Sequence, residues 1–589
     1  MRAASGLPRA MPPALLARAM SQATLLFASV LAAGALSVFA LGQDANWDLQ
    51  NYHFYNAWAF VHQRLAWDIA PAQLQTFHNP LIELPFFWMV NADWPPRLIS
   101  FVMGLPAGVG VFFLGKTLHV LFGNLATKER WFYATVAFVV GITGSASVSQ
   151  LGATVNEWQG AALTLIALWL VVARSARGTL SWPTVVVAGL LCGVADGLKL
   201  TTATYAVGLC CALLLQRPIF RVGLGHALAF GFAVLAGVAV AAGPWMWTLY
   251  SHFANPLFPY FNDVFHSPWW DPKPLLVRNF GPHTLLEWLT FPLPLFGYST
   301  SYVTELRFRD WRLPLLYVFA LAALVAWSIR RIGGRDAVAP SPGARPAWRL
   351  LGVFWCVSFV LWAGIHSIYR YVIPLELLSG ALLVYLLLSL VPPHPMPGAT
   401  IALAARATIR YPGWLHRQFS QHRLKLNISP PRWSVAVTLV ISALAVFTVR
   451  YPDWWHVAYG EHYFEVDVPP VAPHAAVVLV TPAPMAYVLP FFPPDGRFLG
   501  AYNNLNDPTR TNLLEHELAR VIREHDGPLY SLAFPAGAGS EILAAHALRP
   551  AAKGSEADCT SFKTNMSTSP LQLCRLQRVD PETAAARPR

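Results

Sequence analysis

Charged residues are scarce in this sequence. Of its 589 residues only 12% are charged, while 55% are hydrophobic and the mean hydropathy is +0.43. A soluble globular domain carries about twice that charged fraction. The scarcity excludes an ordinary soluble protein. The net charge of +12 does not indicate nucleic-acid binding, because most of the basic residues lie in short loops between apolar runs, where they orient a membrane protein.

Several motifs are also missing. There is no Walker A loop, no GxGxxG preceded by a strand, no HExxH and no evident Ser-His-Asp set. Nothing in the chain therefore predicts a nucleotide site or a hydrolase site.

Cysteine is rare and forms no CxxC pair. Four of the six cysteines (Cys192, Cys210, Cys211 and Cys356) lie inside apolar runs and are interpreted as packing residues. Cys559 and Cys574 lie in the less apolar C-terminal region. They predict a disulfide if that region faces an oxidising compartment, with free thiols as the alternative.

Long apolar runs are abundant. Runs of about 18 residues or more recur over two thirds of the chain, which indicates a polytopic α-helical membrane protein with about eleven transmembrane helices. The first run lacks a clean small-residue cleavage site and is interpreted as a helix rather than a signal peptide. The predicted spans are 21–42, 98–115, 131–149, 157–173, 183–198, 201–216, 224–246, 313–329, 350–367, 371–391 and 433–449.

Most basic residues of the short loops fall on one side of these spans, whereas Arg307, Arg309 and Arg312 of the long loop 247–312 run against this trend. The positive-inside bias makes that side cytoplasmic, together with the N-terminus. An odd number of spans then sends the C-terminal region outside. The chain divides into a transmembrane module, residues 1–450, and an external domain, residues 451–589. A β-branched run at 474–481, an amphipathic pattern at 511–524 and a second strand at 529–534 predict a small α/β domain.

Two carboxylates follow the first span directly. Asp44 and Asp48 stand at the start of a long outer loop, where we expect a catalytic base. A helix over 48–63 would place Asp48, Asn51, Tyr52, Tyr55 and Asn56 on one face, and a second helix is predicted near 81–92. We interpret both as interfacial helices.

The same loop is rich in amides and aromatics. Such groups suit a sugar, whose hydroxyls need hydrogen-bond partners and whose C–H faces stack on rings. An ordinary aromatic belt at the membrane surface is the alternative. The candidate sugar- or acceptor-binding residues are Asn51, Tyr52, His53, Tyr55, Gln75, His78 and Asn79.

Two cations interrupt apolar segments on the predicted outer side. Lys199 follows a helix break at Asp196-Gly197-Leu198, and Arg370 lies in a very short turn with His366 and Tyr369. A cation at such a depth is unfavourable unless it snorkels or meets an anion. We predict a phosphate site at Lys199, Arg370, His366 and Tyr369, with snorkelling and interface anchoring as alternatives.

These motifs together resemble the GT-C superfamily of integral-membrane glycosyltransferases, closest to bacterial members of glycosyltransferase family 87. The resemblance rests on four stretches in order along residues 20–450: Asp44-Ala45-Asn46-Trp47-Asp48 with Asn51-Tyr52-His53, Asp196-Gly197-Leu198-Lys199-Leu200-Thr201, Asn255-Pro256-Leu257-Phe258-Pro259, and Tyr369-Arg370-Tyr371-Val372-Ile373-Pro374.

The resemblance implies an inverting glycosyltransferase in the bacterial inner membrane, with its C-terminal domain in the periplasm. It implies a polyprenyl-phosphate-linked sugar as donor and a glycan or lipid as acceptor. Asp44 or Asp48 would be the base, and Lys199 and Arg370 would hold the donor phosphate. The loop has Asp-x-x-x-Asp and no adjacent acidic pair, so the resemblance leaves open which aspartate acts and whether a divalent metal, Mg or Mn, takes part.

Two other functional classes fit the sequence less well. A lipid or solute transporter or flippase would carry ionisable residues near the middle of its spans, often in repeated halves. Here the spans contain almost no charge, and no long-period repeat is evident. A scaffold protein acting through its external domain would not need about eleven spans.

Overall fold

The structure is a computed structural model of the whole chain. It describes residues 13–273, 275, 280–298, 302–304, 306–333, 341–391, 433–502, 512–535, 539–553 and 556–579.

The predicted helical membrane module is confirmed. A helix lies at each of the eleven predicted spans. Among the described residues, seven helices are long and apolar enough to cross a membrane, and three shorter apolar helices join them. These ten helices and α5 lie at the eleven predicted spans. The eleven are α1 Pro13–Ala40, α4 Pro96–Leu121, α5 Thr127–Ile142, α7 Glu157–Ala176, α8 Trp182–Leu198, α9 Ala203–Leu214, α10 Leu224–Phe253, α13 Arg312–Ile332, α14 Arg345–Ile365, α15 Ile373–Leu390 and α16 Trp433–Phe447.

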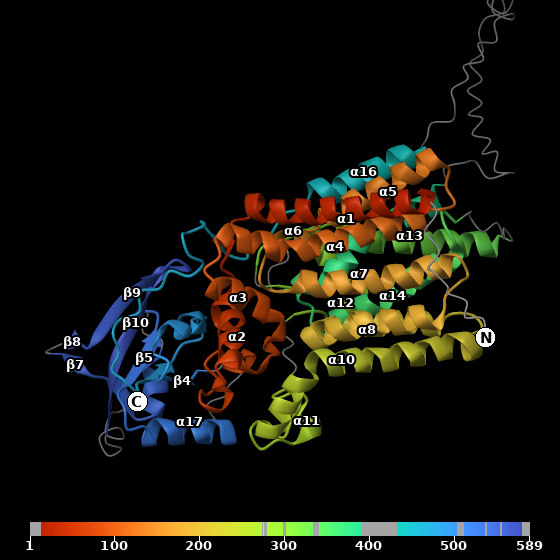
Figure 1. Cartoon of the computed structure of the whole chain (residues 1–589). Coiled ribbons are helices and arrows are strands. Elements are labelled where there is room, and N and C mark those ends of the chain that lie inside the picture. Colours follow the sequence, from red (N-terminus) through yellow and green to blue (C-terminus); the bar gives the residue numbers. More distant parts are fainter. Residues whose placement is uncertain are drawn as a thin grey trace, which may run out of the picture.

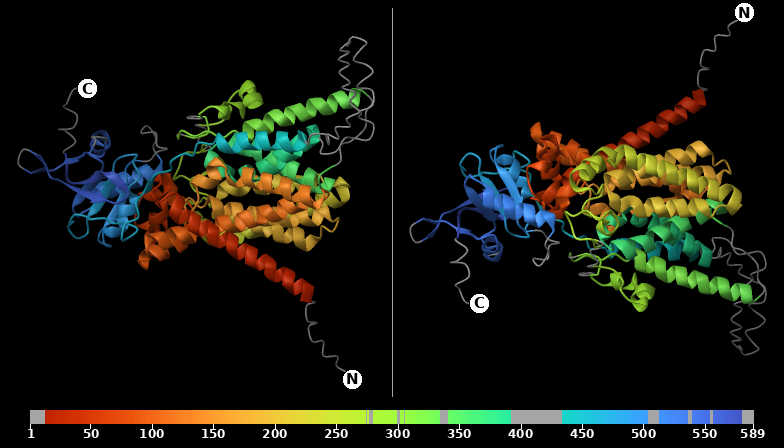
Figure 2. Two further views of the ribbon diagram at one scale, coloured as in Figure 1. Left: turned by 90° about the horizontal axis from the view of Figure 1, so that it is seen from above. Right: turned by 90° about the horizontal axis from the view of Figure 1, so that it is seen from below.

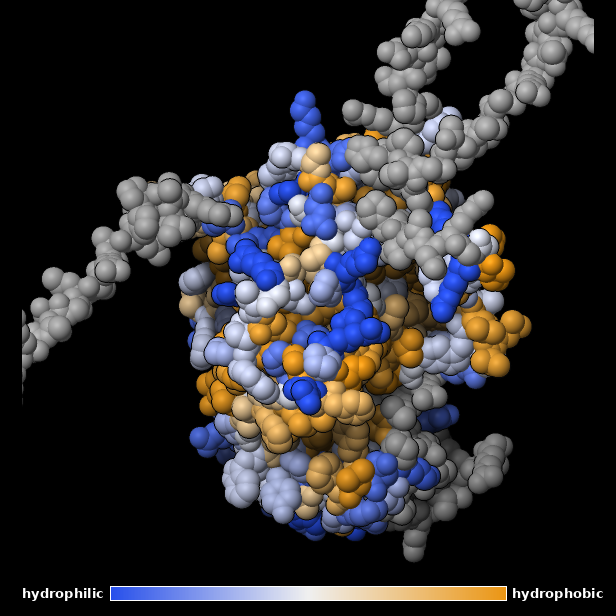
Figure 3. Space-filling view, turned by 90° about the vertical axis from the view of Figure 1, so that its right-hand side faces the viewer, coloured by the Kyte–Doolittle hydropathy of each residue, from blue (hydrophilic) through white to orange (hydrophobic). Residues whose placement is uncertain are grey.

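The helices run side by side, and the C-terminal domain sits at one end of the bundle (Figures 1 and 2). The opposite end carries the connections between α4 and α5, α7 and α8, and α9 and α10. Hydrophilic side chains gather on that end (Figure 3). That end carries Lys128 and Arg130 at the start of α5, Arg174 in the last turn of α7 with Arg177 after it, and Arg217 and Arg221 between α9 and α10. The basic residues between 392 and 432 lie outside the described residues. The sidedness matches the sequence pattern, and the orientation in a membrane stays a prediction.

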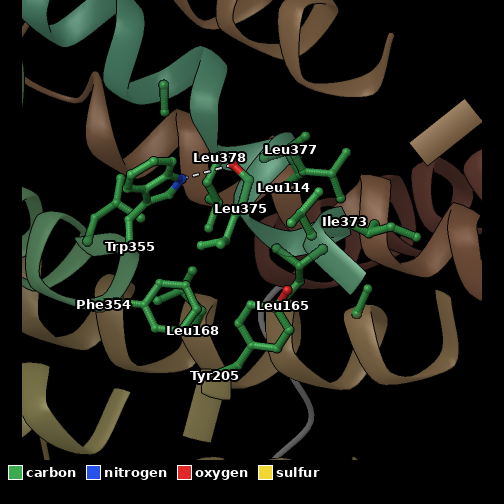
Figure 4. Close-up of a cluster of buried hydrophobic side chains, with 14 of the residues drawn as sticks. Leu114, Leu165, Leu168, Tyr205, Phe354, Trp355, Ile373, Leu375, Leu377 and Leu378 are labelled. Atoms are coloured by element: carbon green, nitrogen blue, oxygen red, sulfur yellow. Dashed lines mark hydrogen bonds between the residues drawn. The ribbon is translucent and has the colours of Figure 1, made fainter. Parts of the chain in front are cut away.

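The bundle has a dense apolar core. Leu114, Leu165 and Leu168 of α4 and α7 pack against the residues of α14 and α15 (Figure 4). Trp355 of α14 donates its indole N–H to the backbone oxygen of Leu375 at 2.9 Å, because a buried N–H requires an acceptor. The core fixes the relative positions of α7, α14 and α15.

Glycines allow α8 and α10 to approach closely. A Cβ on Gly193 would lie 2.1 Å from the backbone oxygen of Val234, so no larger residue fits. Small residues at such crossings are typical of membrane helix pairs. The crossing fixes the end of α8, from which Lys199 projects.

The first outer loop folds into short helices: η1 Leu49–His53, α2 Phe54–Val61, η2 Arg64–Ala66, η3 Gln73–Phe77, η4 Pro80–Glu83 and α3 Leu84–Asn91. Helices therefore occur near 48–63 and 81–92. The sequence predicts interfacial helices with a shared polar face. In the structure the five residues of that face are buried: Asp48, Asn51, Tyr52, Tyr55 and Asn56. The C-terminal domain packs over them (Figure 1).

The C-terminal domain is an α/β sheet, as predicted. Its main sheet has the strand order β4-β3-β5-β10-β6, with β9 paired to β10. Strand β3 is parallel to β4 and β5, and β10 is antiparallel to β5, β6 and β9. The predicted strands and helix correspond to β3 Ala476–Leu479, α17 Leu513–Glu524 and β5 Leu529–Ala533. The other strands of the main sheet are β4 Arg497–Gly500, β6 Leu548–Pro550, β9 Cys559–Thr564 and β10 Ser567–Arg578. Two short helices, η10 Ala486–Phe491 and α18 Ser540–Ala545, complete the elements named here. A disulfide joins Cys559 and Cys574 across β9 and β10.

This domain shares a core with the first outer loop. Strand β1 Gln43–Asp44 pairs with β2 His456–Val457, and Ile69 forms a parallel bridge with Leu499. Phe54 of α2 packs on Phe464 with ring centroids 4.6 Å apart. The loop is therefore held between the bundle and the domain. These pairings join residues far apart in the chain, which the sequence pattern did not predict.

Candidate functional site

Four charged side chains meet where the bundle joins the outer loop. Nη2 of Arg370 lies 2.8 Å from Oδ2 of Asp48, and its Nε lies 3.6 Å from Oε1 of Glu157. Nζ of Lys199 lies 2.8 Å from the same Glu157 oxygen and also donates to the backbone oxygen of Val155. Two carboxylates and two cations thus form one continuous network, which we call the charge cluster: Asp48, Glu157, Lys199 and Arg370.

Each member comes from the end of a different element. Asp48 precedes the π-helix η1, and Glu157 opens α7 after the left-handed Asn156, whose φ is 65°. Lys199 follows α8 in an extended conformation. Arg370 lies in η8 Tyr369–Val372, which is tied to α9 by a hydrogen bond from the Tyr205 hydroxyl to the Tyr371 carbonyl. Because these residues lie at the ends of helices, their side chains are outside the apolar packing of the bundle and can contact one another.

The charge cluster is largely shielded from water. The exposed fractions of the Asp48 and Glu157 side chains are 7% and 4%, and those of Arg370 and Lys199 are 16% and 15%. A cavity of about 10 Å³ lies beside it, lined by residues including Glu157, Lys199, Thr202, Tyr205 and Tyr371. Electrostatic interactions are stronger in such surroundings than in water. Oε2 of Glu157 has no hydrogen-bond partner among the described residues.

The surroundings keep Asp48 ionised. Burial raises the pKa of the Asp48 carboxyl, but the positive charges of Arg370, foremost, and Lys199 act against burial, and the pKa of Asp48 lies below its ordinary value. Burial also lowers the pKa of His78 to about 4, so its imidazole is neutral at pH 7. Its Nε2 lies 2.9 Å from the Tyr260 hydroxyl.

Aromatic rings surround the charged groups. Tyr52 meets His78 edge-on at 5.2 Å between ring centroids. The guanidinium of Arg370 lies 5.3 Å from the Tyr371 ring and 5.8 Å from Trp454, while Lys199 lies 5.5 Å from Tyr371. Such cation–π contacts fix the cations without neutralising them.

His53 and Glu83 of the outer loop form a contact that reaches the start of α7. Nδ1 of His53 lies 2.5 Å from Oε1 of Glu83, and Oε2 of Glu83 accepts from Nδ2 of Asn156 at 2.8 Å. Nε2 of His53 is buried without a hydrogen-bond partner among the described residues.

Asp44 takes a different place from Asp48. Its carboxylate accepts from the backbone N–H and hydroxyl of Thr154, each at 2.7 Å, and from the side-chain amide of Asn46 at 2.7 Å. These bonds occupy both oxygens and fasten the outer loop to the segment before α7. Asp44 is therefore part of the fold of this region, whereas Asp48 faces the cations.

Three other predicted site residues are also used by the fold. The Tyr369 hydroxyl donates to Oε1 of Glu376 at 3.2 Å. It therefore bonds to a carboxylate of α15, whereas the sequence predicts that it binds phosphate. Nδ2 of Asn79 donates to the backbone oxygens of Gly197 and Ala241 at 2.8 and 3.1 Å. The Tyr55 hydroxyl donates to Asp68 at 2.8 Å. Buried polar groups need such partners, which explains why amides and hydroxyls in this loop turned inward.

His366, Asn51 and Gln75 are the other predicted site residues. His366 meets the ring of Tyr371 edge-on at 5.7 Å, and burial lowers the pKa of His366 to about 4. Nδ2 of Asn51 donates to the backbone oxygen of Ala72 at 3.2 Å and to Oε1 of Gln75 at 3.4 Å. His366 is therefore a neutral neighbour of the cations and not a third positive charge.

Four residues of the site were not predicted. They are Glu157, Tyr260, Tyr371 and Trp454. Glu157 could have been predicted from the sequence, because an acidic residue at the start of an apolar span is as unusual as Lys199 at the end of one. Trp454 carried none, because its place depends on the packing of the C-terminal domain.

The metal prediction has no ligand set in this structure. Among the described residues, no group of three or more His, Cys, Asp or Glu side chains could hold a metal ion. The participation of Mg or Mn stays a prediction from the sequence.

Comparison with known proteins does not identify a family for this chain. No family model matches it, and no curated protein matches it. Among solved structures, the chain is similar to ArnT from Cupriavidus metallidurans, determined in complex with undecaprenyl phosphate. The TM-score is 0.39 with 15% sequence identity, over 63% of this chain and 60% of that one. We therefore assign roles from the geometry of the site alone.

Replacing Asp44 with alanine is expected to destabilise the protein. The substitution leaves the backbone N–H and the hydroxyl of Thr154 buried without their acceptor, at a cost of roughly 1–3 kcal/mol for each group left unpaired. Thermal unfolding of the purified protein should show a lower midpoint. Asp453→Ala is the matched control, because that side chain is 82% exposed. Equal midpoints for Asp44→Ala and Asp453→Ala would contradict the structural role.

Proposed function

We propose that this chain is an inverting glycosyltransferase of the GT-C type. It moves a sugar from a polyprenyl-phosphate-linked donor to a periplasmic or lipid-linked acceptor. The observation that supports this proposal is the charge cluster, which combines an ionised carboxylate with two cations in one shielded place at the outer end of a membrane bundle. Proton removal and phosphate departure both need such groups, and here they share a site.

Asp48 is the proposed base. An acceptor hydroxyl gives its proton to the Asp48 carboxylate while its oxygen attacks the anomeric carbon of the donor sugar. The bond from that carbon to the phosphate oxygen breaks, and polyprenyl phosphate leaves with the electron pair. Attack from the face opposite the phosphate inverts the anomeric configuration.

Lys199 and Arg370 are the proposed phosphate ligands. As the reaction proceeds, one negative charge disappears from Asp48 and one appears on the leaving phosphate. Because Arg370 already contacts Asp48, a short movement of its guanidinium allows it to follow that charge. Its planar fork suits a phosphate, and Lys199 supplies a second positive charge on the far side of Glu157.

Donor binding also prepares the base. In the structure Arg370 lowers the pKa of Asp48, which makes the carboxylate a weak base. A donor phosphate that draws Arg370 away removes part of that effect, so the pKa of Asp48 rises once the donor is bound. Proton removal is thereby favoured only when a donor is present.

A transporter or flippase is the other class. Such proteins use ionisable residues along a path through the bundle. The described helices do contain a buried group of this kind, Asp310, Arg312 and Glu376. However, Arg312 is bonded to Asp310 and to the Val140 carbonyl, and Glu376 accepts from the N–H groups of Ala146 and Ser147. A fully bonded network of this kind supports a structural role, so we rank the enzyme first.

Asp48→Asn is expected to lower sugar transfer by about 10²–10⁴-fold, the usual contribution of a general base. The assay is transfer of labelled sugar from a polyprenyl-phosphate donor in membranes that contain the full-length protein. The variant should still bind undecaprenyl phosphate, because Lys199 and Arg370 remain. Asp453→Asn is the control and should be fully active. Full activity in Asp48→Asn would reject Asp48 as the base.

Arg370→Gln is expected to move the acid limb of the activity profile to higher pH. Arg370 holds the pKa of Asp48 down, so its loss raises that pKa, and acidification protonates the base earlier. The measurement is the rate of transfer against pH with both substrates well below saturation, so that the profile reports the free enzyme, in which Arg370 contacts Asp48. Arg370→Lys, which keeps the charge, should restore most of the wild-type limb, and Arg349→Gln at the opposite end of the bundle is the control. An unchanged acid limb in Arg370→Gln would show that Arg370 does not act on Asp48.

A further inference from the structure

One carboxylate of the charge cluster has no part in the proposed reaction. Glu157 takes no proton there and carries no positive charge, yet its Oε1 contacts both cations. This oxygen lies 2.8 Å from Nζ of Lys199 and 3.6 Å from Nε of Arg370. A phosphate that contacts both cations must therefore replace the Glu157 carboxylate at one or both of them.

The backbone that carries Glu157 is fixed. Glu157 is the first residue of α7 and follows Asn156, which has a left-handed conformation that asparagine tolerates better than most residues. Nδ2 of Asn156 donates to Oε2 of Glu83 at 2.8 Å, which ties this backbone to the outer loop. The cations have longer side chains with more rotatable bonds. When a phosphate arrives, Lys199 and Arg370 can therefore turn while Glu157 stays in place.

The structure has no free space for a phosphate beside these groups. The cavity that Glu157 and Lys199 line has a volume of about 10 Å³, which is about the space of one water molecule. Lys199 also donates to the Val155 carbonyl, and Arg370 also contacts Asp48 at 2.8 Å. Each cation thus has a partner besides Glu157, so neither is left unpaired when the contact with Glu157 is given up.

The two phosphates of the proposed reaction differ in charge. The donor is a phosphodiester with one negative charge, whereas polyprenyl phosphate is a monoester whose second pKa is about 6, so above that pH it carries close to two. Two shielded cations attract two negative charges more strongly than one. Without a counterweight, the product would bind more tightly than the donor and slow each turnover. The negative charge of Glu157 supplies that counterweight, because its repulsion also grows with the charge of the phosphate.

We infer that Glu157 is a positioning residue that promotes the release of polyprenyl phosphate. It acts through Lys199 and Arg370, with which it pairs again when the product leaves, as in the structure. The inference rests on the proposed function and adds product release to it.

The test compares two lipids that differ by one charge. The purified full-length protein in detergent at about pH 8 is titrated with undecaprenyl phosphate and with its methyl ester, a diester with one negative charge. Glu157→Gln is expected to bind undecaprenyl phosphate about tenfold more tightly than the wild type and the methyl ester only about threefold more tightly, because the lost repulsion acts on two charges and on one. Glu157→Asp keeps the charge and should restore most of the wild-type behaviour. Glu461→Gln, at an exposed position, is the control and should bind both lipids as the wild type does.

The transfer assay gives a second readout. Added undecaprenyl phosphate should inhibit Glu157→Gln at a concentration about tenfold lower than the wild type, with no rise in the KM for the donor. A merely structural role of Glu157 predicts the opposite, since misplaced cations would raise that KM and weaken inhibition by the product.

The outcomes separate this inference from the proposed function. Unchanged or weaker binding of undecaprenyl phosphate by Glu157→Gln, in a protein whose wild type binds both lipids, would overturn the inference and leave the donor site standing. A wild type that binds neither lipid would count against the donor site itself, and the inference would fall with it. If Glu157→Gln does not fold, the wild type decides. The inference requires that the wild type prefer undecaprenyl phosphate over the methyl ester by less than about tenfold, and a larger preference would overturn it.

Discussion

The contact between Arg370 and Asp48 is the interaction on which this site depends. One guanidinium is shared between Asp48 and Glu157, and Lys199 holds the other side of Glu157. The two negative and two positive charges balance, which allows four charged groups to remain in a shielded place. In the proposed reaction, a donor phosphate would exchange one anionic partner of Arg370 for another, so no unpaired cation would be buried.

The rest of the architecture holds these four groups in place. The apolar core fixes α7, α14 and α15 (Figure 4), and the glycine crossing with α10 fixes α8. The C-terminal domain covers the outer loop and supplies Trp454 beside Arg370. Asp44 fastens the loop to the segment that carries Glu157. The domain therefore contributes to the geometry of the site and is more than an appendage of the bundle.

Much of the fold could be predicted because apolar length and local periodicity determine it. Every predicted span coincides with a helix, and the strands at 474–481 and 529–534 follow from their β-branched and apolar residues. The charge cluster was partly accessible for the same reason, since Lys199 and Arg370 are rare charges among apolar residues. Contacts across long separations were not accessible. Nothing local distinguishes Asp48, which meets Arg370, from Asp44, which meets Thr154, and nothing local shows that Tyr369 turns toward Glu376 while Tyr371 lies beside the cations.

The most direct test of this account is an experimental structure of the full-length protein with undecaprenyl phosphate. The account predicts phosphate oxygens within about 2.7–3.2 Å of Nζ of Lys199 and of the Arg370 guanidinium, with Arg370 turned away from Asp48. A phosphate bound elsewhere, with the contact between Arg370 and Asp48 intact, would contradict it.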